Sequence, residues 1–166
     1  MYYSQIRKYD TSNGVGIRTT LFVSGCTRSC DGCFNEEYKN FKNGLLWDEN
    51  TENNFLEIIA SNIIHGVSIL GGEPFDQIQD DTLLKFIKRI KSEVNKNIWI
   101  YSGYTFEEII SHPKRRSILE NCDVLVDGPF DKRLKDIRLY FRGSSNQRII
   151  DIQNSLKHSH IALFDI

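Results

Sequence analysis

Short apolar runs alternate with amphipathic stretches along this chain, and that alternation constrains its fold more than any other feature. Four runs are rich in β-branched residues and have the length of buried strands; they cover residues 19–23, 67–70, 98–101 and 124–126. Two more possible strands lie near residues 148–151 and 161–164. Strands that alternate with helices are typical of βα units. The sequence therefore predicts an α/β fold with a mostly parallel sheet.

Helical stretches separate the first strands. Apolar side chains recur at helical spacing in residues 55–63 and again in residues 83–94, where lysines occupy the opposite side. Asp80 and Asp81 mark the beginning of the second helix, because acidic residues favour a helix N-terminus. Thr105 is placed to cap a short helix over residues 106–110. Each helix thus falls between two predicted strands, as βα units require.

The length and composition indicate one globular domain over residues 1–166. The chain has 40% hydrophobic and 26% charged residues, which is typical of a soluble protein. Its formal net charge is −1, so neither nucleic acid nor an anionic membrane is indicated as a partner. No apolar run is long enough to span a bilayer, and the first residues lack the basic-then-apolar layout of a signal peptide. We therefore expect a cytoplasmic protein.

Polar and glycine-rich positions follow the predicted strands at the points where they end. A cysteine-containing segment follows the first strand, and Gly71-Gly72-Glu73 follows the second. Ser102-Gly103 and Asp127-Gly128 follow the third and fourth. Ligands of parallel α/β folds bind where the loops at the carboxyl ends of the strands converge. We expect these four segments to line one mouth.

The cysteine segment carries the strongest chemical signal. Cys26, Cys30 and Cys33 form the pattern CxxxCxxC, and such clustering in a reducing compartment favours metal or redox chemistry over disulfides. A four-iron cluster has four iron corners, usually held by four thiolates. Three close thiolates would hold three corners and leave one iron open to bind a substrate. Gly25 and Gly32 would let backbone N–H groups approach the sulfur atoms.

Zinc is the alternative metal for these cysteines. A structural zinc site takes four ligands, typically as two spaced pairs. The fourth ligand would have to be Cys122, His65, His112 or a carboxylate, and none of these stands in a second pair. Cys122 precedes an apolar run and is expected to pack as a small hydrophobic residue. The spacing favours the iron–sulfur cluster and leaves zinc open.

Several segments along the chain match a known pattern in order and spacing. They are GVGIR at residues 14–18, residues 21–35 with the cysteines, LGGEP at 70–74, YSGYT at 101–105, VLVDGPF at 124–130 and RGSSNQR at 142–148. With them the chain resembles the radical S-adenosylmethionine superfamily and, within it, the family of enzymes that activate the anaerobic ribonucleoside-triphosphate reductase. Many superfamily members have an aromatic residue just before the third cysteine, whereas Gly32 stands there in this chain and Phe34 follows. That family tends to share this arrangement.

The resemblance implies an open, incomplete (β/α) barrel and a 4Fe-4S cluster that binds S-adenosylmethionine at its open iron. It further implies reductive cleavage of S-adenosylmethionine to a 5′-deoxyadenosyl radical, which takes a hydrogen atom from a glycine of the reductase's large catalytic subunit. A flavodoxin or a ferredoxin is the implied electron donor. Two alternatives remain: an activating enzyme of pyruvate formate-lyase or another glycyl-radical enzyme, and a zinc-binding domain without catalysis. The first is usually longer, and the RGSSNQR segment argues against it.

The resemblance also implies roles for residues that follow the later strands. Gly71, Gly72 and Glu73 match the site of the methionine ammonium, where an anionic side chain and exposed carbonyls suit a cation. The alternative is a plain strand-to-helix turn with an acidic first residue. Ser102 and Asp127 match positions near the ribose, the carboxylate or a monovalent cation. The alternative for both is ordinary turn chemistry.

Three residues of the cysteine segment and two arginines complete the predicted site. Gly32, Phe34 and Asn35 match positions that contact the adenine, Phe34 through its ring; the alternative for Phe34 is core packing. Arg142 and Arg148 flank a run of small polar residues. A guanidinium binds carboxylates and peptide carbonyls well, so these two would hold the S-adenosylmethionine carboxylate or the partner's glycine loop. The alternative is a solvated turn.

Overall fold

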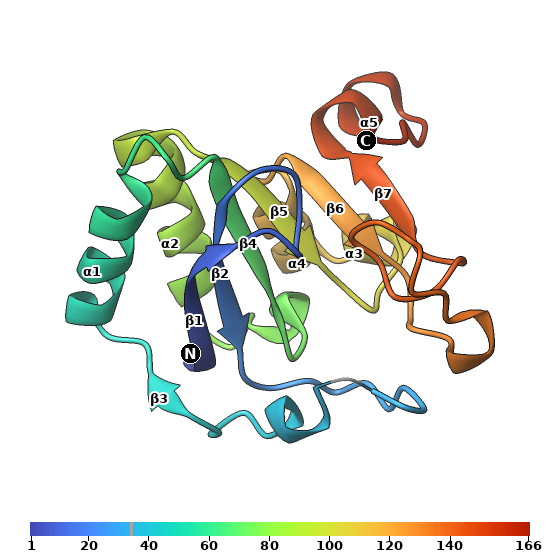
Figure 1. The fold of residues 1–166 in the computed structure, drawn as a ribbon, viewed down its shortest axis with the longest axis horizontal. Coiled ribbons are helices and arrows are strands. Elements are labelled where there is room, and N and C mark those ends of the chain that lie inside the picture. The colour runs from blue at the N-terminus through green and yellow to red at the C-terminus, as the bar shows by residue number, and fades with distance from the viewer. Residues whose placement is uncertain (34) are drawn as a thin grey trace.

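The computed structural model describes residues 1–33 and 35–166, which form a sheet flanked by helices (Figure 1). In these residues the sheet has seven strands in the order β3-β1-β2-β4-β5-β6-β7. The strands are β1 (Tyr2–Asp10), β2 (Arg18–Val23), β3 (Leu45–Leu46), β4 (Gly66–Gly71), β5 (Asn97–Tyr101), β6 (Val124–Asp127) and β7 (Arg148–Asp151). Each of the four best-defined predicted strands is present.

The centre of the sheet is parallel. β2, β4, β5 and β6 pair in parallel, with Thr19 opposite Val67 and Ile100 opposite Leu125. β1, β3 and β7 join the two sides in antiparallel orientation. In the described part of the chain the strand order ends at β3 and β7, so the sheet is open and does not close into a barrel. The predicted fold class, an open and incomplete (β/α) barrel, is confirmed.

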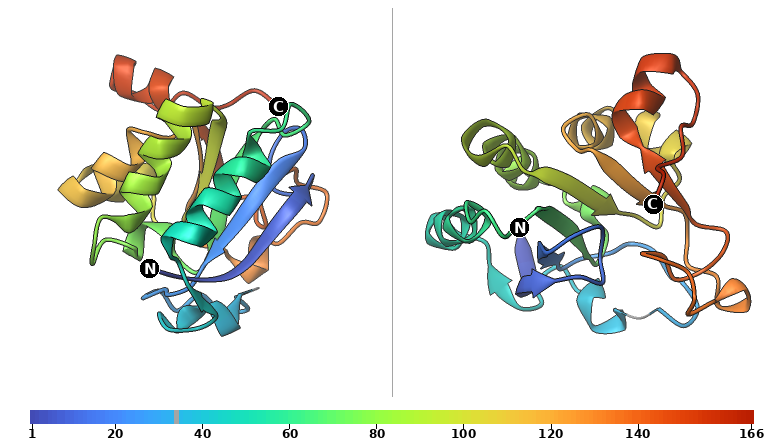
Figure 2. Two further views of the ribbon diagram at one scale, coloured as in Figure 1. Left: turned by 90° about the vertical axis from the view of Figure 1, so that its left-hand side faces the viewer. Right: turned by 45° about the horizontal axis from the view of Figure 1, so that its top comes forward.

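The helices cover one face of the sheet (Figures 1 and 2). They are α1 (Glu49–Ile59), α2 (Thr82–Arg89), α3 (Phe106–Ile110), α4 (Pro113–Leu119) and α5 (Ile152–His158). Thr105 caps α3 as predicted, since its hydroxyl accepts from the N–H of Glu108 while the Glu108 side chain accepts from the N–H of Thr105. Among the described residues, every helix is too short or too polar to cross a membrane.

The main core lies between the helices and the sheet. Leu21, Ile69, Ile100 and Leu125 come from the four parallel strands and are fully buried. Alternate residues of a strand point to opposite faces, so Trp99 of β5 faces the other side of the sheet, as do Val124 and Val126 of β6. There a smaller cluster packs around Trp99, with Phe141 and Phe164 against it. Both faces of the central strands are therefore covered, which explains their nearly continuous apolar sequence.

A buried arginine, Arg18, fills the space where the parallel strands begin. Arg18 is 2% exposed, and its guanidinium donates to the carbonyl of Val67 at 2.7 Å and to Ser68 Oγ at 2.7 Å. It also lies over the Trp99 ring, 5.4 Å from the centroid. Burial lowers the pKa of Arg18 to about 10. This residue fills the space at the beginning of β2, so the open cavity lies at the opposite ends of the parallel strands.

Two strand predictions differ from the structure. β1 was not predicted, because its sequence YYSQIRKYD mixes charged and aromatic residues and its side chains are largely exposed or half-buried. Residues 161–164 were predicted as a strand, but only Leu163 forms an isolated bridge, with Ile150 of β7. The helices α4 and α5 were also not predicted. Both are seven residues long, too short for a clear helical period.

Candidate functional site

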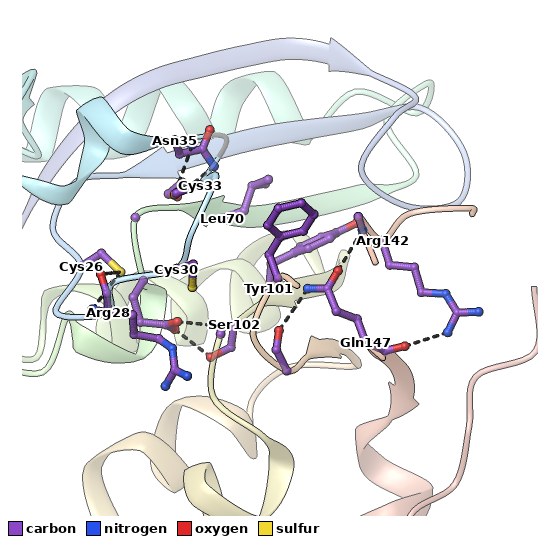
Figure 3. Close-up of a pocket in the computed structure, with 17 residues that line it drawn as sticks. Cys26, Arg28, Cys30, Cys33, Asn35, Leu70, Tyr101, Ser102, Arg142 and Gln147 are labelled. Atoms are coloured by element: carbon purple, nitrogen blue, oxygen red, sulfur yellow. Dashed lines mark hydrogen bonds between the residues drawn. The ribbon is translucent and has the colours of Figure 1, made fainter. Parts of the chain in front are cut away.

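A cavity opens where the four parallel strands end, as the sequence predicts (Figure 3). Its volume is about 850 Å³ when the space at its open mouth is included. The predicted site residues that line it are Cys26, Cys30, Cys33, Asn35, Gly71, Gly72, Glu73, Ser102 and Arg142. They come from the segments after β2, β4 and β5 and from the connection between β6 and β7. The convergence of these segments is confirmed.

The three cysteines are half-buried and face this cavity. Backbone N–H groups donate to two of the sulfur atoms, from Arg28 to Cys26 at 3.4 Å and from Asn35 to Cys33 at 3.4 Å. Such N–H···S bonds are typical of cysteines that hold iron–sulfur clusters. The sequence predicted Gly25 as a donor, but its N–H donates to the carbonyl of Tyr38 at 2.7 Å instead.

Burial favours the neutral thiol of Cys26. It raises the pKa of the Cys26 thiol to about 11, and the nearby carboxylates of Glu73 and Asp76 add to the shift. A thiolate at this position therefore needs a cation beside it, which iron supplies. In residues 1–33 and 35–166, no three Cys, His, Asp or Glu side chains gather around one point that would hold a single metal ion. The three cysteines line the wall of one cavity.

Cys122 stands apart from this group. It is fully buried in the main core, and its thiol donates to the carbonyl of Ile118 at 3.5 Å. Burial raises the pKa of this thiol well above its usual range. The prediction that Cys122 packs as a small hydrophobic residue is confirmed.

The segment after β2 is held tightly against the segment after β4. The carbonyl of Gly25 accepts from the N–H of Glu73 at 2.8 Å and from Gln77 Nε2 at 3.1 Å. A Cβ at Gly72 would lie 2.4 Å from the carbonyl oxygen of Gly25, so only glycine permits this approach. The glycines of the Gly-Gly-Glu segment therefore bring its backbone against the first residues of the cysteine segment.

A buried polar network also holds the cysteine segment, and sequence reasoning missed it. Asp76 Oδ2 accepts from the N–H of Thr27 at 2.8 Å and from its hydroxyl at 2.7 Å. Asp76 Oδ1 accepts from the hydroxyl of Tyr104 at 2.8 Å and from Arg115 Nη2 at 3.3 Å. The Tyr104 ring also lies between two guanidinium groups, those of Arg115 at 3.8 Å and Arg28 at 4.6 Å. The only sequence signal for Asp76 was its position just after the Gly-Gly-Glu-Pro segment.

Glu73 lines the cavity but is already bonded within the protein. It is 1% exposed, and its carboxylate accepts from Ser102 Oγ at 2.8 Å, from the N–H of Gly103 at 2.8 Å and from the N–H of Phe75 at 3.1 Å. Burial raises its pKa to about 7, and these three donors limit the rise. Glu73 and Ser102 thus tie the segment after β4 to the segment after β5. Their contact with S-adenosylmethionine stays a prediction.

The residues predicted at the adenine are placed differently from one another. Asn35 lines the cavity, and its side-chain amide donates to the carbonyl of Gly71 at 3.0 Å. Gly32 is exposed outside the cavity lining, with a left-handed φ of 69° and the side chain of Lys132 beside it. Phe34 lies outside the residues that the structure describes.

Asp127 and Arg148 contact each other, and neither of them lines the cavity. Asp127 is 1% exposed and accepts from Arg148 Nε at 3.0 Å and from the N–H of Phe106 at 2.7 Å. Arg148 also pairs with Glu107 at 2.9 Å, and this contact lowers the pKa of Glu107 to about 2. Gly128 lines the cavity in place of its neighbour Asp127. The pair joins β6 to β7 beside the site.

Some buried donors without a hydrogen-bond partner belong to residues that line the cavity. In the described part of the chain they include Arg28 Nε, the Tyr101 hydroxyl and Arg142 Nε, and all three residues line the cavity (Figure 3). Arg142 uses only its Nη1, which donates to the carbonyl of Gln147 at 2.7 Å. A buried donor without a partner is costly, so these groups fit a ligand rich in acceptor atoms. The donor set thus fits a cluster at the cysteines with an oxygen-rich cofactor beside it.

Comparison with known proteins gives the class of this site. Residues 12–150 match the family model described as a 4Fe-4S single cluster domain. The match covers all three cavity cysteines and each segment that lines the cavity. It agrees with the iron–sulfur interpretation of the CxxxCxxC segment and does not support zinc.

Curated relatives narrow the class further. The chain is 41% identical to a protein of Pasteurella multocida over 90% of its length, which covers 96% of that protein. It is 39% identical to a protein of Haemophilus influenzae and 35% identical to one of Enterobacteria phage T4, over 90% of its length each and 97% and 93% of theirs. All three are named anaerobic ribonucleoside-triphosphate reductase-activating protein. The chain belongs to this family of activating proteins.

Proposed function

We propose that this chain generates the glycyl radical on the large catalytic subunit of the anaerobic ribonucleoside-triphosphate reductase. When bound, the cluster supplies the electron that splits S-adenosylmethionine into methionine and a 5′-deoxyadenosyl radical, which takes a hydrogen atom from a backbone glycine of the reductase. The observation that carries the proposal is the meeting of Cys26, Cys30 and Cys33 with the Gly71-Gly72-Glu73 segment in one cavity. The names of the curated relatives support the choice of reductase.

The roles of the residues follow from their places in the cavity. Cys26, Cys30 and Cys33 would hold three irons of the 4Fe-4S cluster, which would leave the fourth iron available to S-adenosylmethionine. The backbone of Gly71 and Gly72 approaches the methionine moiety, because glycine leaves its carbonyls accessible. The cavity walls hold S-adenosylmethionine in position while its carbon–sulfur bond breaks.

Cationic groups supply the remaining contacts to S-adenosylmethionine in this proposal. Arg142 and Arg28 line the cavity, and the Nε of each has no hydrogen-bond partner in the described part of the chain, so both are available to acceptor atoms of the cofactor. Asn35 stands near the adenine, where its amide is already oriented by the carbonyl of Gly71. The two arginines balance the negative charge of the carboxylate and of the cluster thiolates.

The electron comes from a flavodoxin or a ferredoxin in this proposal, and the reaction takes place in the cytoplasm. The reduced thiols that the cluster requires are maintained in that compartment. An activating role toward pyruvate formate-lyase is the weaker alternative, since the relatives of this chain carry the name of the reductase.

An anaerobic radical assay tests the function. The reconstituted protein is reduced and mixed with S-adenosylmethionine and the purified catalytic subunit, and the mixture is examined by electron paramagnetic resonance. A glycyl-radical signal on the reductase is expected, together with one methionine and one 5′-deoxyadenosine per radical. Pyruvate formate-lyase serves as the comparison substrate. A signal on pyruvate formate-lyase with none on the reductase would contradict the proposal.

A further inference from the structure

The connection between β6 and β7 carries an exposed apolar tip beside the cavity. We propose that residues 130–142, here called the rim loop, are the docking surface for the reductase's catalytic subunit, an inference that rests on the proposed function. Ile137 is 91% exposed and Tyr140 71% exposed, and Leu134 joins them at 43%. Exposed apolar side chains that gather in one loop beside a cavity offer the kind of surface that a protein partner covers.

The base of the rim loop is fixed, so the tip is presented in a defined place. Phe141 packs its ring on Trp99, 5.4 Å between centroids, and holds a left-handed φ of 56° that few side chains adopt. The N–H of Asp131 donates to Ser144 Oγ at 3.2 Å, and Asn146 Nδ2 donates to the carbonyl of Pro129 at 2.8 Å. These contacts hold the two ends of the loop together and turn the tip away from the core.

Backbone hydrogen bonds order the rim loop, from the N–H of Ser145 to the carbonyl of Leu134 at 3.0 Å and from the N–H of Asp136 to the carbonyl of Gly143 at 3.4 Å. Two ion pairs also lie within the loop. Arg133 pairs with Asp131 at 2.7 Å, and Arg138 pairs with Asp136 at 2.8 Å. Both arginine side chains are almost fully exposed, so the backbone bonds contribute more to the order of the loop than these pairs do. A preordered loop loses less entropy when a partner binds than a mobile one does.

The rim loop also borders the opening through which the substrate must come. Phe130 and Arg142, at its two ends, line the cavity itself. Lys132 lies over the cysteine segment, because a Cβ built at Gly32 would be 3.2 Å from its Cδ. A protein seated on Ile137 and Tyr140 would therefore stand directly beside the mouth.

The occupant follows from the reaction and from the charge. The hydrogen atom comes from a backbone glycine, so the protein that carries this glycine must send a segment into the cavity. The rim loop contains five Lys or Arg residues and two Asp, whereas the whole chain has a net charge of −1. The matching surface on the catalytic subunit is thus an apolar recess flanked by carboxylates, with the glycine segment next to it.

Serine substitutions at the tip test this surface. The double variant Ile137→Ser/Tyr140→Ser is compared with Ile63→Ser, a half-exposed apolar residue that precedes β4 at the opposite end of the sheet. We expect the tip variant to raise the Kd for the purified catalytic subunit about tenfold or more, since central apolar and tyrosine residues dominate such interfaces. Its glycyl-radical yield at limiting catalytic subunit should fall in parallel, and added salt should weaken the association of the unmodified protein.

Cleavage of S-adenosylmethionine without the reductase separates this inference from the proposed function. With dithionite as reductant, the tip variant should form 5′-deoxyadenosine at the unmodified rate, because Ile137 and Tyr140 do not line the cavity. If the unmodified protein makes no glycyl radical on the reductase, the proposed function fails. If it does and the tip variant binds the catalytic subunit equally well, the docking surface is refuted. Loss of self-association alone, seen by sedimentation, would assign the rim loop to a second copy of this chain and also refute it.

Discussion

At the residue scale, the cysteine segment is held in place by side chains that come from distant parts of the chain. Asp76 bonds Thr27 through both its backbone and its hydroxyl, and Tyr104 and Arg115 hold the carboxylate from the other side. The sulfur atoms of Cys26 and Cys33 receive N–H bonds from residues of the segment itself. The positions of the cysteines therefore depend on groups that do not touch the cluster.

Cysteine substitutions should separate the cluster ligands from the core cysteine. Replacing Cys26, Cys30 or Cys33 with Ala should abolish cluster retention, because only two thiolates would remain. Cys122→Ala should keep the cluster, at a cost of about 1–2 kcal/mol in the free energy of unfolding for the lost core packing. Iron and sulfide analysis after anaerobic reconstitution measures retention. Loss of the cluster in Cys122→Ala would contradict the division of the cysteines into three ligands and one core residue.

Asp76→Asn should loosen the cysteine segment without removing a ligand. Its amide group cannot accept from both Thr27 and the Tyr104–Arg115 side, so the network should lose about 2 kcal/mol of hydrogen bonding to a charged group. We expect a chelator to remove iron several times faster from this variant than from the unmodified protein. Asp80→Asn, at an exposed aspartate, is the control. Equal rates of iron loss in all three proteins would show that the network does not hold the segment.

Sequence reasoning found the residues of the site that belong to short continuous patterns. The spacing of Cys26, Cys30 and Cys33 and the Gly71-Gly72-Glu73 segment correctly predicted one shared cavity. Asp76 and Arg115 were not found, because their contact joins residues that are 39 positions apart and no local pattern marks it. The predicted roles of the individual site residues in cofactor binding stay predictions.

At the element scale, single carboxylates join neighbouring strand ends. Glu73 follows β4 and accepts hydrogen bonds from Ser102 and Gly103, which follow β5. Asp127 ends β6 and receives Arg148 from the beginning of β7. The segments around the cavity are thus connected in pairs, so the stability of the site depends on the charge state of these groups.

Glu73 should make stability fall with rising pH. Its pKa is raised from 4.5 to about 7, so the folded protein binds its proton more tightly than the unfolded chain does. The stabilisation is present below the lower value and is lost as the pH rises through the higher one, about 3 kcal/mol in all. Urea unfolding at about pH 5 and about pH 8 measures this change. Glu73→Gln should show a smaller difference between the two, and an equal difference would contradict the assignment.

Arg148→Ala should destabilise the connection of β6 to β7. It leaves the Asp127 carboxylate, which is 1% exposed, without its guanidinium, at a cost of about 3–5 kcal/mol. Asp127→Asn in the Arg148→Ala background should recover part of this loss, since no buried charge remains. Thermal and urea unfolding of the single and double variants give the coupling between the two residues. Additive effects would mean that the two side chains do not depend on each other.

The elements that the sequence predicted best are those with one clear pattern. The buried runs of β2, β4, β5 and β6 are nearly all apolar, and the Thr105 capping box marks α3. β1 was missed because its composition is not typical of a strand; it is a strand because it pairs with β2. Residues 161–164 have strand composition but reach β7 at only one bridge. Tertiary contacts decided these two segments, and local propensity could not.

At the scale of the whole molecule, the open sheet leaves two edges. β3 offers only two residues at one edge. At the other edge the C-terminal segment covers β7, since the N–H of Asp151 donates to the carbonyl of Ala162 at 2.9 Å and the N–H of Phe164 donates to that of Ile149 at 2.8 Å. Short or covered edges limit pairing with other chains. That the whole of residues 1–166 forms one domain stays a prediction.

Removal of residues 161–166 should expose the edge of β7. The backbone groups of Ile149 and Asp151 would lose their partners, and Trp99 would lose the ring of Phe164, 5.3 Å away between centroids. We expect the shortened protein to aggregate on mild heating, as measured by light scattering. Removal of residues 165 and 166 alone is the control and should leave scattering unchanged. Equal scattering from both shortened proteins would contradict a protective role for the segment.

The open mouth of the cavity also affects the order in which the glycine and the electron should arrive. A cavity that is open to solvent lets other C–H or S–H donors reach a primary carbon radical before it meets the glycine. The productive sequence is therefore one in which the glycine arrives first and the electron last. An electron delivered before the glycine is in place therefore consumes one molecule of S-adenosylmethionine and yields no glycyl radical.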